Sequence, residues 1–452
     1  MSDEMVLKKD IEARSDSAHD LTSDEKVKLV DEQVDGTPWQ QAVPLMTVYA
    51  ILSIWTIHLL TAMYTEVKAR RIKNGLWKGY TDKGVKGGRA LQYFEVIGEL
   101  CGKPAKYFVL LITIISLLST AIAQIIACST GFYYLIDTVD KRTWSLVWGA
   151  ILTCTMSMIP TFRHFRIFNV IALVGTAYTA VYLWIVAGHH GLDGAAFYEG
   201  PTKLQNLFLG ANVFMNAFGG HTMSFEVIDA MFQPSKYDRV YPLSYLFTVF
   251  VTVPHSILIQ LAFPAANAKY GNVYGVVPVS AARDVSIVLM IIHQFVAYAL
   301  YITPVFFMFE KLLGTHNKPW FIRLPSRLPV ALFVYLIAVL LPFYDTINAI
   351  MGSFGNSFTA FVFPAGAYLW TYLRGGSIAR RNAPKQPPRF FGGSWTAVFV
   401  LNTFIFIYFL VFGVGFGSWA SVKNLVDQVS TLGVFASCYQ CSQIQTTNRI
   451  NG

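Results

Sequence analysis

The sequence predicts an all-α integral membrane protein. Three observations support this: the composition, a series of long apolar segments, and basic loops that alternate along the chain. Of the 452 residues, 54% are hydrophobic and only 13% are charged, whereas soluble domains carry roughly 25% charged residues. The mean hydropathy is +0.46. Such a chain cannot cover its apolar surface with polar side chains, so lipid has to cover it.

The first element in chain order is a polar, acidic tail, residues 1–43. Its first 36 residues hold eleven Asp and Glu against five Lys and Arg, and they contain no apolar core of a signal peptide. We expect this tail to be disordered, because it lacks the apolar residues that would offset the entropy of ordering it.

Ten apolar segments follow the tail, and most reach the ~20 residues that a membrane-spanning helix needs. Two of them, 144–160 and 328–342, are short. The expected spans are 44–66, 107–135, 144–160, 167–188, 204–230, 240–264, 284–309, 328–342, 346–373 and 395–415. A C-terminal tail, 416–452, completes the chain.

Basic residues in the loops test this count of ten. The loop 67–106 holds ten Lys and Arg, and the next loop holds only two, which Asp137 and Asp140 balance. The later loops repeat the alternation, as the positive-inside rule requires. The sequence therefore predicts ten crossings with the loop 67–106 in the cytoplasm. This orientation explains the basic pI of about 9.1 without a nucleic-acid partner, and it places both tails outside.

The fifth expected span contains a break, in the stretch NAFGGHTMSFE at 216–226. Gly219 and Gly220 each weaken a helix by about 1 kcal/mol relative to alanine. His221 follows them, and its unperturbed side chain titrates near neutral pH. Ionisable residues inside a span are costly and usually functional, and broken helices form the sites of secondary transporters. We therefore expect Gly219, Gly220 and His221 to bind an anionic substrate, and His221 and Glu226 to couple protons.

A structural interpretation of the same residues stays open. The two glycines could serve close helix packing, His221 could be a hydrogen-bonded core residue, and Glu226 could mark the cytoplasmic end of the span. Polar residues at similar depth in other spans form a possible seam around the break. The further candidates for substrate binding are Gln124, Tyr178, Asn216 and Gln294. Singly, such residues more often join helices by hydrogen bonds.

Other motifs argue against competing functions. His189 and His190 lack further ligands for zinc, so no metal site is expected. Cys438 and Cys441 favour a local disulfide on the outer side over a metal site, and the five cysteines are too scattered for a disulfide scaffold. Nucleotide-binding glycine motifs and nucleophile arrangements are absent. We therefore expect neither an enzyme nor an ATP-driven pump, and no cofactor besides the proton as coupling ion.

Several collinear stretches resemble the plant-type auxin influx carriers of the amino acid/auxin permease family. They are QIIACSTGFYYLIDTVDKRTW (124–144), GPTKL (200–204), the FGGH break, IHQF (292–295), RLPV (327–330), NAPKQPP (382–388), SWTAVFVLN (394–402) and GFGSWASVKNLVDQVSTLGVFASCYQC (415–441). The resemblance runs from about Ala42 to Cys441. It implies a LeuT-like bundle of two inverted repeats, 44–188 and 204–373, and an extra helix, 395–415. It also implies proton-coupled auxin uptake at the plasma membrane, with His221 at the family's intrahelical histidine.

The chain departs from this family in one respect. The family has eleven spans, and the chain supports ten, because nothing matches the family's first broken helix. A non-transporting or regulatory relative, or an incomplete gene product, therefore stays an alternative to a carrier. An amino acid permease with another substrate is a second alternative. A channel is disfavoured, because a break at the midplane suits alternating access. The sequence fixes no oligomeric state.

Overall fold

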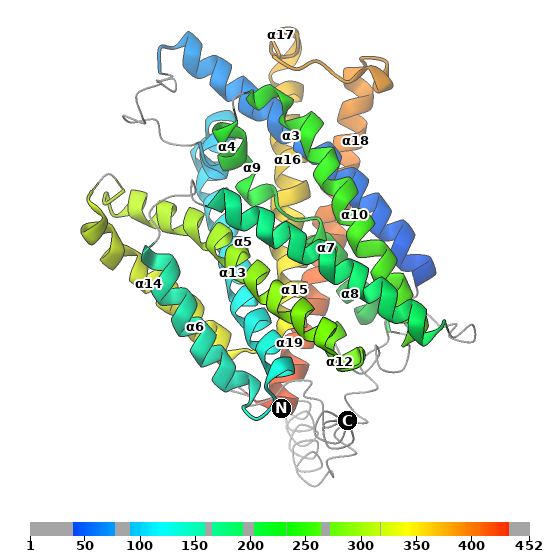
Figure 1. The fold of residues 1–452 in the computed structure, drawn as a ribbon. Helices are drawn as coiled ribbons and strands as arrows, with labels where there is room; N and C mark the ends of the chain where they lie inside the picture. Colours follow the sequence, from blue (N-terminus) through cyan, green and yellow to red (C-terminus); the bar gives the residue numbers. More distant parts are fainter. Residues whose placement is uncertain are drawn as a thin grey trace, which may run out of the picture.

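The computed structural model describes residues 39–76, 91–158, 165–192, 203–231, 233–263, 272–316 and 318–433. All of the regular structure in these ranges is helical, and the helices form one bundle (Figure 1). Helices suit this apolar chain because each helix satisfies its own backbone hydrogen bonds, and lipid offers no partners to backbone N–H and C=O groups. The predicted all-α class is therefore confirmed.

The first half of the described chain contains these elements: α3 (Trp39–Lys73), α4 (Tyr93–Cys101), α5 (Lys103–Leu135), α6 (Lys141–Met158), α7 (Phe165–His190), α8 (Leu204–Ala217), η2 (His221–Met223), α9 (Ser224–Ala230), η3 (Pro234–Lys236) and α10 (Tyr237–Ala262). The second half contains α12 (Val273–Val276), α13 (Ala281–Leu312), α14 (Trp320–Leu340), α15 (Tyr344–Ile350), η4 (Met351–Val362), α16 (Phe363–Leu369), η5 (Trp370–Arg374), α17 (Gly376–Arg381), η6 (Arg389–Phe391), α18 (Trp395–Tyr408), η7 (Phe409–Gly417) and α19 (Ser418–Leu432).

Seven described helices are long and apolar enough to cross a membrane. They correspond to α3, α5, α7, α10, α13, α14 and the continuous helix from α18 to α19. Three further segments match the remaining predicted spans: α6, the interrupted α8–α9 pair, and the helical run from α15 to η5. The described chain therefore agrees with the predicted count of about ten. The expected disulfide at Cys438 and Cys441, and most of the acidic tail, lie outside the described residues.

Two helices extend well beyond the expected spans. Helix α14 begins at Trp320, eight residues before the expected 328, and continues through two prolines. Its charged first turns are stabilised because Arg323 and Arg327 both donate to Glu310 of α13, at 2.9 and 2.7 Å. The helix at the last expected span, 395–415, also continues beyond it, through α19 to Leu432.

Helix α5 lies at the centre of the bundle, where it packs against α13, α4, α6 and η4. Close approach of helices within the bundle depends on small residues. A Cβ at Gly355 of η4 would lie 2.8 Å from Oγ of Ser116 on α5, and one at Gly149 of α6 would lie 2.3 Å from the ring of Tyr335 on α14. The glycines therefore let neighbouring helices pack without side-chain collision.

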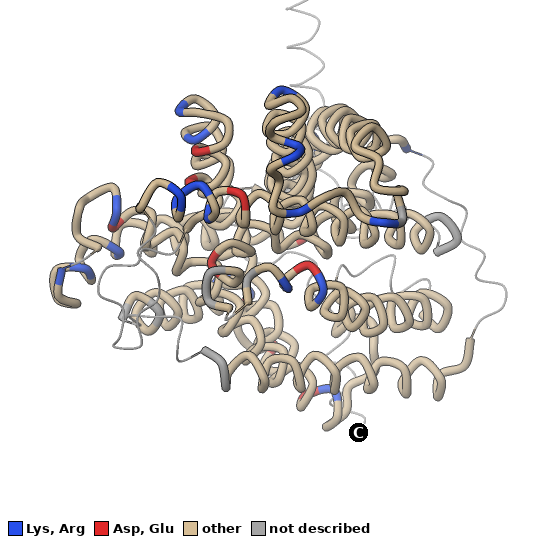
Figure 2. Tube along the Cα trace, turned by 90° about the horizontal axis from the view of Figure 1, so that it is seen from above, with Lys and Arg blue, Asp and Glu red and all other residues tan. Residues whose placement is uncertain are grey.

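Basic loops gather at one end of the bundle, the upper end in Figure 1, which we call the basic end. Figure 2 looks down on this end and shows Lys and Arg around it. Ion pairs connect the elements at this end: Arg71 of α3 with Glu99 of α4, Lys311 of α13 with Glu95 of α4, and Lys385 with Asp238 of α10. These loops are the ones that the alternation of charge predicts on one side of the membrane.

Candidate functional site

The predicted break is present. Helix α8 ends at Ala217, and the backbone turns at Phe218, whose N–H donates to Phe214 O at 3.3 Å. A single turn of 3₁₀ helix, η2, then begins at His221 and leads into α9. Because α8 and α9 are separate, the backbone between them is not part of a continuous helical ladder.

The two glycines of the break meet different neighbours. A Cβ at Gly219 would lie 2.3 Å from the side-chain amide of Asn356 in η4, which leaves no room for it. A Cβ at Gly220 would meet only Oη of Tyr241, at 3.4 Å. Gly219 therefore allows α8 and η4 to approach closely, whereas space at Gly220 is not limiting.

The His221 side chain is fully buried and faces α3. Its Nε2 lies 2.9 Å from Oγ1 of Thr56 and 3.3 Å from the carbonyl oxygen of Ser53. The Thr56 hydroxyl itself donates to Ser53 O at 3.0 Å. A carbonyl can only accept, and the Thr56 hydrogen is already used, so Nε2 carries the proton of the neutral ring.

This tautomer leaves Nδ1 of His221 with a lone pair. Nδ1 is buried and has no hydrogen-bond partner among the described residues. A buried polar atom without a partner is uncommon in proteins and costs free energy. Nδ1 is therefore a free base inside the bundle, able to accept a proton or a donor group from a ligand.

Three asparagines join α8 to the helical run that begins with α15. Nδ2 of Asn356 donates to Oδ1 of Asn216 at 2.9 Å, and Nδ2 of Asn216 donates to Oδ1 of Asn348 at 3.1 Å. The predicted residue Asn216 thus lies at the centre of an amide chain beside Gly219. Its side-chain oxygen and nitrogen both have protein partners.

Glu226 does not pair with His221. Its Oε1 accepts from Nε2 of Gln92, at 3.4 Å, and its Oε2 is buried without a partner among the described residues. The same Gln92 side chain accepts from Nζ of Lys311 at 2.6 Å. Glu226 instead faces α4 and the end of α13. His221 lies in the 3₁₀ turn η2 and Glu226 in α9, and the two side chains have different partners.

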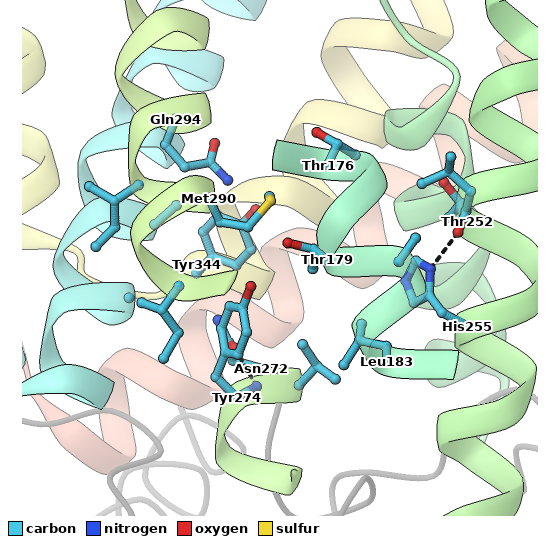
Figure 3. Close-up of a pocket in the computed structure, with 17 residues that line it drawn as sticks. Thr176, Thr179, Leu183, Thr252, His255, Asn272, Tyr274, Met290, Gln294 and Tyr344 are labelled. Atoms are coloured by element: carbon cyan, nitrogen blue, oxygen red, sulfur yellow. Dashed lines mark hydrogen bonds between the residues drawn. The ribbon is translucent and has the colours of Figure 1, made fainter. Parts of the chain in front are cut away.

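The remaining predicted residues lie apart from the break. Oη of Tyr178 donates to Ala282 O at 3.3 Å, which joins α7 to α13. Oε1 of Gln124 on α5 is buried without a hydrogen-bond partner in the described chain. Gln294 on α13 lines a cavity of about 280 Å³ between α5, α7, α10 and α13 (Figure 3). No residue of the break lines this cavity.

Sequence reasoning missed the partners of the two ionisable residues. Ser53 and Thr56 contact His221 from α3, and Gln92 and Lys311 connect to Glu226 from α4 and α13. One signal was available: Gln92 and Glu95 have capping-box spacing, and they cap α4. No cluster of three or more potential metal ligands occurs in the described ranges.

The family model and the sequence relatives agree on one class of protein. The model of the family "transmembrane amino acid transporter protein" matches residues 39–422. Auxin transporter protein 1 of Arabidopsis thaliana is 38% identical over 88% of this chain and 80% of its own. Auxin transporter-like protein 4 of Medicago truncatula is 37% identical over 87% of this chain and 79% of its own. The match with an inward-facing structure of Mhp1 covers 94% of this chain and 91% of the Mhp1 chain, at 12% sequence identity and a TM-score of 0.47.

Proposed function

The chain belongs to the transmembrane amino acid transporter family and is a multi-pass membrane transporter similar to plant auxin transporters, and we propose that it carries auxin-like anions into the cell with protons. The substrate class is indole-3-acetate or a related aromatic or amino acid anion, and the membrane is the plasma membrane. The names of the relatives support the substrate class.

The unpartnered Nδ1 of His221 is the observation that carries the proposal of proton coupling. A proton on Nδ1 would make the ring a cation in a fully buried position. A buried cation is strongly disfavoured unless an anion lies beside it. A substrate carboxylate supplies that anion, so proton and substrate each favour the binding of the other.

Coupling then follows from reciprocal linkage: whatever factor the proton adds to substrate affinity, the substrate adds to proton affinity. On the more acidic outer side, both bind. In the cytoplasm, loss of the proton leaves the carboxylate without its counter-charge, and release follows. The contacts of Nε2 with Ser53 and Thr56 hold the ring in one orientation while Nδ1 gains and loses its proton.

Glu226 has a second role in this proposal. Glu226 accepts a hydrogen bond from Gln92, which in turn accepts one from Lys311. These two hydrogen bonds connect α9 to α4 and α13 at the basic end. Protonation of Glu226 would remove a negative charge from this group, and we propose that this loosens α9 when the site opens inward.

The test is uptake of labelled indole-3-acetate by cells that lack such carriers, with external pH varied from 5 to 7.5. We expect saturable uptake that rises as the pH falls. His221→Gln places an amide N–H where Nε2 lies but has no counterpart to Nδ1. It should flatten the pH dependence while surface expression stays near that of the original chain. Thr56→Val removes one contact of Nε2 and leaves Nδ1 in place, so its pH dependence should persist.

An unchanged pH profile in His221→Gln would show that His221 is a packing residue and that protons travel elsewhere. Saturable uptake of amino acids with no uptake of indole-3-acetate would assign the chain to another substrate of the same family. Absence of any saturable uptake from a chain that reaches the cell surface would favour a non-transporting relative.

A further inference from the structure

The cavity between α5, α7, α10 and α13 has its own ligand chemistry, separate from the break. Its walls are largely apolar or aromatic, with Leu183, Met290, Tyr274 and Tyr344 among them (Figure 3). No Lys, Arg, Asp or Glu lines it. At about 280 Å³ it is near the lower limit of small-molecule sites, so a compact ligand is required.

His255 presents a defined acceptor to this cavity. Its Nδ1 lies 2.6 Å from Val251 O one turn earlier in α10. A carbonyl oxygen only accepts, so Nδ1 carries the proton and Nε2 has the lone pair. No described side chain or backbone group bonds to Nε2. A ligand with an N–H or O–H can therefore donate to it.

The other polar groups of the cavity are mostly committed to one another. Oγ of Ser286 lies 2.8 Å from both Oγ1 of Thr179 and Oη of Tyr274, which fixes these two side chains in the wall. Oδ1 of Asn272 accepts from the backbone N–H of Tyr274 at 3.0 Å. The Gln294 side chain has no protein hydrogen bond in the described chain and lines the cavity with an amide that can donate or accept.

We propose that this cavity binds an uncharged, planar aromatic molecule of about the size of indole. The ring would lie against the aromatic and aliphatic wall, one N–H or O–H would donate to Nε2 of His255, and Gln294 would contact the ring or a second polar atom. A carboxylate would find no cation in the lining, and burial of an unpaired charge is costly. The site therefore selects against the anion that the break is proposed to bind, and it does not depend on that proposal.

Occupation of this cavity would have a mechanical consequence. The ligand would touch four long helices, α5, α7, α10 and α13, and also Tyr274 of α12 and Tyr344 of α15. Because transport requires helices to move against one another, a ligand that fills the space between four of them should hold one arrangement. We therefore expect a neutral aromatic ligand to lower the maximal rate of uptake rather than to compete with the anionic substrate.

Equilibrium binding to the purified full chain in lipid nanodiscs tests the site, with empty nanodiscs to correct for partition into lipid. The probes are labelled indole and 1-methylindole, which has the same ring but no N–H. Indole should bind saturably and roughly five- to tenfold more tightly than 1-methylindole, since one hydrogen bond contributes about 1 kcal/mol. An excess of indole-3-acetate at pH 7.5 should displace little of it.

Two pairs of variants make the test specific. His255→Asn keeps a donor near Val251 O but has no acceptor at Nε2, so it should abolish the preference for indole, whereas His255→Gln should retain part of it. Ala127→Phe fills the cavity and should abolish binding of both probes, whereas Ala150→Phe, at an exposed position on α6, should leave binding unchanged. Size-exclusion chromatography first checks that each variant elutes at the same volume as the original chain, and is therefore folded.

Two results would overturn the proposal. One is saturable indole binding that is unaffected by Ala127→Phe, which would place the ligand elsewhere. The other is binding no greater than in empty nanodiscs, which would show that the cavity takes no such ligand. Because His221→Gln leaves this cavity intact, its effect on pH-dependent uptake and its lack of effect on indole binding keep the two proposals distinguishable.

Discussion

At the scale of single residues, the two glycines of the break differ in what a methyl group would meet. At Gly219 it would collide with the Asn356 amide at 2.3 Å, whereas at Gly220 the nearest atom is Oη of Tyr241 at 3.4 Å. Gly219→Ala should therefore destabilise the protein by about 1–3 kcal/mol, as overpacking does, and Gly220→Ala should change its stability little.

Thermal unfolding of the purified variants in one detergent measures this difference. Asn356→Ala in the Gly219→Ala background should recover part of the loss, because it removes the atoms that collide. Equal destabilisation by both glycine variants would contradict the close approach of α8 and η4.

The residues at the break show how far a sequence can predict a site. Two adjacent glycines before a histidine predict an interrupted helix, and α8 does end there. The partners of His221 could not be predicted, because Ser53 and Thr56 precede it by 168 and 165 positions and nothing local encodes that contact. The partners of Glu226 could not be predicted either, because Gln92 and Lys311 lie on distant segments of the chain.

At the scale of elements, α4 is the clearest feature that the sequence did not predict, since 67–106 was expected to be one loop. Glu95 accepts from the backbone N–H of Gln92 at 3.0 Å and completes a capping box at the start of α4. The helix buries Tyr93, Phe94, Val96 and Ile97 against the bundle. Its nine residues are too few to span a membrane, and a search for spans therefore could not find it.

Lys311 joins three elements at the basic end. Its Nζ donates to Gln92 at 2.6 Å and lies 3.4 Å from Glu95, and Gln92 in turn contacts Glu226 of α9. A double-mutant cycle with Lys311→Met and Glu95→Gln should give a coupling of about 0.5–1 kcal/mol, because both side chains are partly exposed.

Denaturation of the four proteins in the same detergent gives that coupling. The control cycle pairs Lys311→Met with Glu66→Gln, since Glu66 bonds instead to Arg70 one turn away on α3. A coupling within error of the control would show that the Lys311–Glu95 contact does not join α13 to α4.

Cys101 at the end of α4 provides a pH-dependent measurement outside the spans. Burial raises the pKa of its thiol to about 11, and the thiolate is the reactive form. Below pH 11 the thiol is mostly protonated, so each unit of pH increase up to that value should raise the rate of alkylation about tenfold.

The measurement uses a variant in which Cys101 is the only cysteine, alkylated with iodoacetamide in detergent between pH 7 and 10. A variant with a cysteine at the exposed Ser377 instead should react faster at pH 8 and level off at lower pH. A rate for Cys101 that levels off near pH 9 would show that the thiol is not buried as described.

Helix ends illustrate what limits prediction at this scale. Helix α14 begins eight residues before the expected span 328–342, where Pro325, Pro329 and two arginines resemble a loop. The helix persists there because buried Glu310 pairs with Arg323 and Arg327. Similarly, α19 is held against the bundle because Nδ2 of Asn424 donates to Oγ1 of Thr346 on α15 at 3.0 Å. Both causes are tertiary contacts, which apolar periodicity does not contain.

At the scale of the whole molecule, hydropathy and loop charge predicted most of the architecture. The all-α class agrees with the described chain, which has seven helices long enough to cross a membrane and three further segments at the remaining predicted spans. The loops predicted on one side of the membrane do meet at the basic end, through pairs such as Arg71–Glu99 and Lys385–Asp238. The inverted repeat of 44–188 and 204–373 stays a prediction, as does the orientation in the membrane.

The orientation of the bundle in the membrane can be tested with one exposed residue at each of its two ends. Ser377 is exposed on α17 at the basic end, and Thr138 is exposed just beyond the far end of α5 (Figure 1). Helix α5 has 33 residues, about 50 Å at 1.5 Å per residue, which exceeds the ~30 Å hydrocarbon core. Because Lys and Arg are retained in the cytoplasm, a cysteine at Ser377 should react with a membrane-impermeant maleimide only after permeabilisation.

A cysteine at Thr138 should react in intact cells, and the background for both variants has alanine at the five native cysteine positions. Labelling of both positions in intact cells would mean that one end of the bundle is not where the ten-span topology puts it. Labelling of Ser377→Cys but not of Thr138→Cys in intact cells would show that the orientation is the reverse of the predicted one. In that case Glu226 would face outside, and its protonation could not loosen α9 as the site opens inward, so the proposed role of Glu226 would fail together with the topology.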